Sequence, residues 1–104
     1  MTIAGDILWY RGFHDVPRVF CVAGDEGVYV FESRFDDERD EYVDAYDVYW
    51  IRESEGARAE PDALLALVAA HEAMARVAVA DVTFDSTRRH SMQASVPPKR
   101  VRTL

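Results

Sequence analysis

Carboxylates and aromatic rings crowd together at residues 35–50, FDDERDEYVDAYDVYW, where seven acids and five rings share sixteen positions. Such a segment suits the binding of a basic protein surface, because rings supply anchoring contacts in interfaces and charges speed the encounter. The alternative is a solvated loop whose charges keep a sheet edge from pairing with other chains, with its rings in the core. We expect the partner-binding residues to be Asp36, Asp37, Glu38, Asp40, Glu41, Tyr42 and Tyr46.

The same segment has part of the pattern of a calcium-binding loop. Asp36, Glu38 and Asp40 alternate as the first ligands of such a loop do. However, Glu41 stands where that loop requires glycine, and Asp47 stands where it requires a bidentate glutamate. The segment therefore does not match an EF-hand. A looser divalent-cation site stays open as an alternative, and we expect no bound metal or cofactor.

Three histidines and a pair of aspartates raise the alternative of catalysis. His14, His71 and His90 lack the HxH or HxxxH spacing of metal ligands. Asp81 and Asp85, four apart on one face of a predicted strand, could act as an acid–base pair or simply face solvent. A small metal-assisted hydrolase built on these residues is our second hypothesis. Because the chain has no glycine-rich phosphate loop, nucleophile elbow or CxxC motif, our first is a non-enzymatic interaction module or inhibitor.

The charge of the chain is strongly asymmetric. The net charge of −7 argues against general affinity for nucleic acid or an anionic membrane, because both repel an acidic protein. Residues 1–85 hold all 19 acids, whereas residues 86–104 hold none and have five bases. We therefore expect a globular domain over 1–85 and an irregular basic tail over 86–104. The bases of the tail are Arg88, Arg89, Lys99, Arg100 and Arg102.

The basic tail has three interpretations. It can fold back onto the acidic segment of its own chain or of a neighbour in a dimer, because the two charges are opposite. It can instead contact phosphates, although five dispersed charges would bind them weakly and in a strongly salt-dependent way. A frayed terminus is the third interpretation. The expected partner is accordingly a basic protein surface or the basic tail of this same sequence.

Length and composition predict one globular domain. A chain of 104 residues buries about two thirds of the surface that its unfolded form exposes, and 49% hydrophobic residues is ordinary globular usage. The single cysteine, Cys21, cannot form an internal disulfide and lies in a predicted strand, where cysteine packs as a small apolar residue. No run approaches the roughly 18 to 20 apolar residues of a membrane span, so we expect a cytoplasmic protein without membrane contact.

The first half of the chain has the pattern of β structure. Two runs rich in valine and aromatic residues flank GDEG at 24–27, which predicts a hairpin over 18–35. Both alternating faces of this hairpin are apolar, so we expect both to be buried. The acidic residues 35–45 are predicted to be a loop or short turn. Further predicted strands lie at 6–13, 46–52 and 77–85.

One helix is predicted to begin at Pro61, a residue that the first turn of a helix tolerates, with Asp62 near the positive end of the helix dipole. Because alanine and leucine leave little that is polar on the other side, the helix is either sandwiched inside the domain or shared with a second subunit. A homodimer through this helix is our expectation. Its apolar stripe is Leu64, Leu67, Val68, His71, Met74 and Ala75.

These elements together predict an α+β fold. Its sheet is small and antiparallel, has four or five strands and can curl into a partly open barrel. The single apolar helix is inserted before the last strand.

Overall fold

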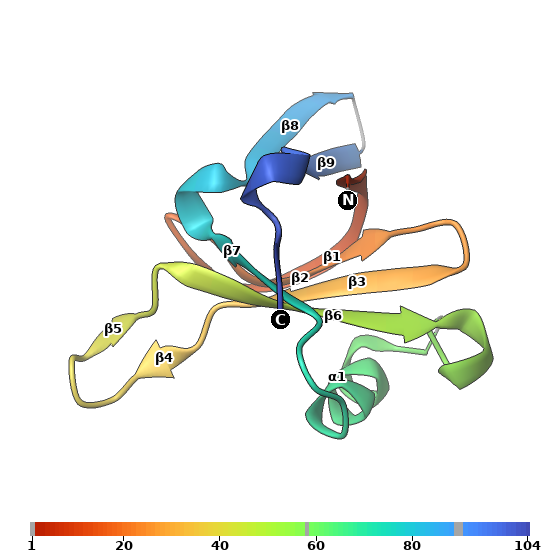
Figure 1. The fold of residues 1–104 in the computed structure, drawn as a ribbon, viewed down its shortest axis with the longest axis horizontal. Helices are drawn as coiled ribbons and strands as arrows, with labels where there is room; N and C mark the ends of the chain where they lie inside the picture. Colours follow the sequence, from red (N-terminus) through yellow and green to blue (C-terminus); the bar gives the residue numbers. More distant parts are fainter. Residues whose placement is uncertain (1, 58, 89–90) are drawn as a thin grey trace.

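The protein is built on an antiparallel sheet that curls into a half-barrel, with a helix on its outer side and a two-stranded arm at one end (Figure 1). This computed structural model describes residues 2–57, 59–88 and 91–104. In the large sheet the strands follow the order β10-β7-β6-β3-β2-β1-β9-β8, while β4 and β5 pair with each other. The elements are β1 (Ile3–His14), β2 (Val16–Ala23), β3 (Gly27–Glu32), β4 (Phe35–Asp36), β5 (Glu41–Tyr42), β6 (Ala45–Arg52), η1 (Glu53–Glu55), α1 (Pro61–Ala69), β7 (Ala75–Ala78), η2 (Val79–Asp81), β8 (Thr83–Arg88), β9 (Ser91–Val96), η3 (Pro98–Arg100) and β10 (Arg102–Thr103).

The hairpin predicted from the sequence is confirmed as β2 and β3. Its loop closes where the N–H of Gly24 donates to the carbonyl oxygen of Gly27 at 2.9 Å. A side chain is excluded at Gly27, because a Cβ there would overlap the carbonyl oxygen of Ile51 in β6. That close approach lets β3 pair with β6 along its whole length, which makes β2, β3 and β6 the centre of the sheet.

Both faces of these central strands are buried, as predicted, because alternate side chains point to opposite faces. On the concave face Phe20, Phe31 and Tyr46 pack ring against ring, and the centroids of Phe20 and Phe31 lie 4.6 Å apart. On the outer face the side chains of Leu64 and Val68 hold α1 against the sheet. The domain therefore has two apolar layers, one inside the curl of the sheet and one beneath the helix.

The sheet has more strands than the four or five predicted. The expectation of an irregular segment over 86–104 is wrong where this segment forms β9 and β10. β9 joins the sheet because Ala94 and Val96, each 2% exposed, turn toward the core while Val96 pairs with Ile3 of β1. We also predicted that residues 1–85 form a globular domain by themselves, and this stays a prediction.

The predicted strand over 77–85 is also wrong as a single element. β7 ends at Ala78, and the short turn η2 leads into β8. The hydrophobic pattern does not reveal this break. Val79, the first residue of η2, packs against the concave cluster, and Val82, directly after η2, is buried in it.

The helix begins at Pro61, as predicted, but ends at Ala69. Pairing of β7 with β6 overrides the high helical propensity of the residues that follow, so Ala75 begins a strand. Four strands of the large sheet come after the helix, which corrects its predicted place before the last strand. No helix in the described ranges is long and apolar enough to cross a membrane.

Candidate functional site

The acidic segment forms a small hairpin that projects from the end of the sheet (Figure 1). We call residues 35–42 the acidic arm. Asp36 shapes its turn, because the carboxylate oxygen Oδ1 accepts the N–H of Glu38 at 3.0 Å and that of Arg39 at 3.3 Å. Asp40 completes the turn in the left-handed conformation, with φ of 55°. A turn is confirmed at residues 37–40, but the prediction of a loop over 35–45 is wrong for residues 35–36 and 41–42, which pair as β4 and β5.

Aromatic contacts fix the arm to the sheet. The rings of Phe35 and Tyr42 meet edge to face with centroids 5.1 Å apart. The guanidinium of Arg18 in β2 lies over the ring of Tyr42, 4.9 Å from its centroid. At the root of the arm the hydroxyl of Ser33 donates to the carbonyl oxygen of Val43 at 2.8 Å. The arm therefore has a defined geometry relative to the sheet.

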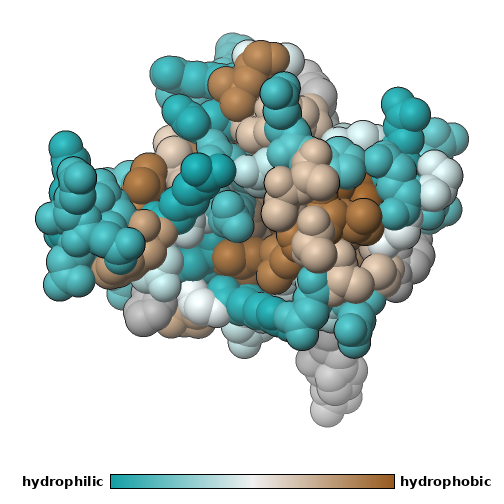
Figure 2. All heavy atoms as spheres, turned by 90° about the horizontal axis from the view of Figure 1, so that it is seen from below, coloured by the Kyte–Doolittle hydropathy of each residue, from teal (hydrophilic) through white to brown (hydrophobic). Residues whose placement is uncertain are grey.

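Four of the five carboxylates of the arm point to solvent. In Figure 2, which views the molecule from below, the arm is a mostly hydrophilic projection on the left. Among the described residues, the ion pair of the arm is internal and long, from Arg39 Nε to Asp36 Oδ2 at 3.9 Å. The residues Asp37, Glu38, Asp40 and Glu41 are exposed. Of the predicted partner-binding residues, six lie together on the arm.

Tyr46, the seventh, lies elsewhere. Its side chain is 0% exposed in the concave core, and its hydroxyl donates to the carbonyl oxygen of Pro17 at 2.7 Å. Burial raises the pKa of this hydroxyl to about 12, against a smaller opposing effect of Arg18. The prediction that Tyr46 contacts a partner does not fit its position, because a core residue of β6 cannot reach another molecule.

Two acids on the strands beside the arm, Glu32 and Asp47, are paired with arginines of the same chain. Asp47 in β6 accepts from Arg76 Nε at 3.1 Å and also lies 3.5 Å from Arg34 Nε. Arg34 lies 3.5 Å from Glu32 as well. The pKa of Arg34 is raised, mainly by its hydrogen bond to the hydroxyl of Tyr49. The negative charges of Asp47 and Glu32 raise it further. Within the described residues, Glu32 and Asp47 on the sheet are therefore paired with arginines, whereas Asp37, Glu38, Asp40 and Glu41 on the arm have no ion pair.

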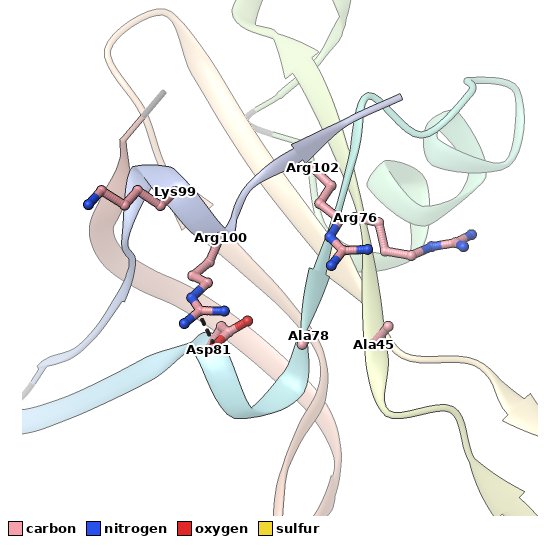
Figure 3. Close-up of a pocket in the computed structure, with 7 residues that line it drawn as sticks. All are labelled: Ala45, Arg76, Ala78, Asp81, Lys99, Arg100 and Arg102. Carbon is pink, nitrogen blue, oxygen red and sulfur yellow. Dashed lines mark ion pairs between the residues drawn. The ribbon is translucent and has the colours of Figure 1, made fainter.

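A hollow of about 240 Å³ with a basic lining opens beside the root of the arm (Figure 3). We call its four bases, Arg76, Lys99, Arg100 and Arg102, the basic face. Arg100 Nε lies 3.8 Å from Asp81 Oδ1. Within residues 2–57, 59–88 and 91–104, neither Lys99 nor Arg102 has a carboxylate partner, and no ion pair joins the basic face to the acidic arm.

Sequence reasoning found three of these four bases as a tail but missed the face that they form. Arg76 stands alone in the sequence and joins the others because β7 pairs with β10, with Arg76 opposite Arg102. Of the remaining predicted tail bases, Arg89 and the side chain of Arg88 lie outside the described residues.

The residues proposed for catalysis are spread over different elements. Asp81 lies in η2 and Asp85 in β8, so they do not share one strand face as predicted. His90 and the side chain of His14 lie outside the described residues. The described part of the chain contains no group of three or more His, Cys, Asp or Glu residues that could hold a metal ion.

His71 instead joins the end of α1 to η1. Its Nδ1 lies 2.8 Å from the carbonyl oxygen of Leu67, and its Nε2 lies 2.8 Å from Glu55 Oε2. Both ring nitrogens can donate only in the imidazolium form. The bond to the Leu67 carbonyl has the larger effect and the bond to Glu55 the smaller, and both raise the pKa of His71. The hydrogen bond from His71 in turn lowers the pKa of Glu55. The predicted position of His71 on a helical stripe is wrong, because α1 ends before it.

Comparison with family models, with curated protein sequences and with solved structures finds no match to this chain.

Proposed function

We propose that the protein is a non-enzymatic binding module that docks its acidic arm on a basic surface of a protein partner. The observation that carries this proposal is a contrast between neighbouring acids: Asp37, Glu38, Asp40 and Glu41 of the arm are exposed and have no ion pair within the described residues, whereas Asp47 is paired with two arginines. Charges that no neighbouring arginine neutralises remain available to an incoming basic surface.

The form of the arm supports the same role. Its turn is held by Asp36 and its root by the ring contacts of Tyr42, so little conformational freedom is lost when a partner binds. Phe35 and Val43, 46% and 44% exposed, place apolar surface next to the carboxylates. Apolar contacts surrounded by charge are the usual composition of a protein interface.

Capture of partners by variants of matched charge tests the proposal. The arm variant Asp37→Lys/Glu38→Lys alters exposed side chains and leaves the turn-forming Asp36 in place. The control Asp25→Lys/Glu26→Lys makes the same change of charge in the exposed loop between β2 and β3, at the other end of the sheet (Figure 1).

We expect the wild type and the loop control to retain the same partners from a cell extract, and the arm variant to lose at least one, as quantified by mass spectrometry. Partners retained equally by all three proteins would contradict the proposal.

A further inference from the structure

We infer that a partner of the acidic arm is the basic face of a second copy of this chain, so that two copies exchange arms in a closed dimer. This inference rests on the proposed function, because it names the surface on which the same arm docks.

The shape of the basic face indicates the class of ligand. Figure 3 shows its side chains spread along the surface, with Lys99 extending to one side of the hollow, Arg76 to the other, and Arg102 between Arg100 and Arg76. A single small anion would need donors that converge on one point. A row of separate cations instead matches an extended segment with several carboxylates, and each contact gains the strength of a charge-assisted hydrogen bond.

The acidic arm is such a segment in both charge and form. Five carboxylates and Arg39 give residues 35–42 a net charge of −4. Two of the four bases of the basic face are paired with acids of the same chain, Arg100 with Asp81 and Arg76 with Asp47, so the face together with these two acids has a net charge of +2. Since neither surface is matched by the other within the described part of one chain, a second copy is the partner that completes both.

The position of the two surfaces favours a closed exchange. A smaller hollow at the root of the arm, lined by Arg34, Val43, Ala45, Asp47 and Arg76, shares Ala45 and Arg76 with the basic hollow. Arm and face are therefore adjacent in each copy. If a two-fold axis runs beside this shared wall, the arm of each copy can reach the basic face of the other. Every arm and every basic face is then occupied, so no further copies can add to the dimer.

Solution mass by light scattering tests the exchange, because the dimer depends on ion pairs. We expect a mass near twice 11.8 kDa at about 0.1 M salt, which falls toward the monomer at about 1 M salt. The arm variant Asp37→Lys/Glu38→Lys is expected to be monomeric at the lower salt concentration. The face variant Lys99→Glu/Arg102→Glu, which leaves the Arg100–Asp81 and Arg76–Asp47 pairs intact, is expected to be monomeric too.

Mixing the two variants provides the sharpest result. One copy then supplies an unaltered arm and the other an unaltered face, so one of the two contacts is the native one. In the other contact the substituted arm has a net charge of 0, and attraction comes from the two introduced lysines facing the two introduced glutamates. We expect the equimolar mixture to recover the dimeric mass. The loop control Asp25→Lys/Glu26→Lys should remain a dimer, and circular dichroism of each variant checks that its fold is unchanged.

Three outcomes would overturn the inference. The first is a wild type that stays monomeric at low salt. The second is a dimer that persists in both the arm variant and the face variant, which would mean that it forms through another surface such as α1. The third is an equimolar mixture of the two variants that stays monomeric. A monomeric wild type whose arm variant still loses a partner protein would leave the proposed function standing without the exchange. If reversal of the arm changes neither mass nor partners, both proposals fail.

Discussion

The acidic arm and β6 come from one continuous run of sequence, yet their side chains are held by different forces. In β6, Tyr46 and Val48 are 0% exposed, and Asp47 between them is neutralised by two arginines. On the arm, Asp37 and Glu38 face solvent, and its turn is held by hydrogen bonds of Asp36. Burial therefore sets the stability of the sheet, whereas the arm contributes surface and charge.

This difference separates the residues that hold the fold from those available for binding. Side chains of the sheet lose contacts and leave cavities when they are shortened. Exposed charges far from such contacts usually change the stability of a protein by no more than about 0.5 kcal/mol. Substitutions are therefore expected to fall into two groups, according to whether they alter the sheet or the arm.

The largest effect is expected at the helix that covers the outer face of the sheet. Leu64 is 0% exposed in the cluster beneath α1, so Leu64→Ala should lower the free energy of unfolding by about 2 to 5 kcal/mol. Leu67 is half-buried at the margin of the same cluster and serves as the matched control, with a smaller loss for Leu67→Ala. Denaturant unfolding measures both. Equal losses would mean that α1 is not anchored through Leu64.

A smaller effect is expected for the hydroxyl of Tyr46. Tyr46→Phe keeps the ring against Phe20 and removes the hydrogen bond to the carbonyl oxygen of Pro17, which leaves a buried acceptor without that donor. The free energy of unfolding should fall by about 1 to 3 kcal/mol. An absorbance titration should find one tyrosine of the wild type with a pKa of about 12, absent from the variant. A Tyr46 hydroxyl that titrates near the ordinary pKa of tyrosine would show that water reaches this part of the core.

The local parts of this fold were predictable because their signals lie in neighbouring residues. GDEG between two apolar runs identified the hairpin of β2 and β3, and Pro61 marked the start of α1. The end of the helix was missed because pairing of β7 with β6 outweighs the helical propensity of alanine. β9 was missed because its partner β1 lies near the other end of the sequence.

The candidate site divides in the same way. Tyr42 and Tyr46 look alike in the sequence, four residues apart in an acidic run, and only the path of the chain sends one to the arm and the other to the core. The basic face was missed because Arg76 meets Arg102 through strand pairing, without any local signal. Composition thus identified the acidic surface, whereas its basic counterpart required the three-dimensional arrangement.

The smallest effect on stability is expected at the acidic arm, where we expect the largest effect on binding. Asp37→Lys/Glu38→Lys should change the free energy of unfolding by less than about 0.5 kcal/mol, because the two side chains are exposed and make no ion pair within the described chain. Denaturant unfolding at a concentration where the variant is monomeric measures this value without the contribution of self-association. A loss comparable to that of Leu64→Ala would show that the arm unfolds together with the sheet, and the distinction between a stable body and a binding arm would then be wrong.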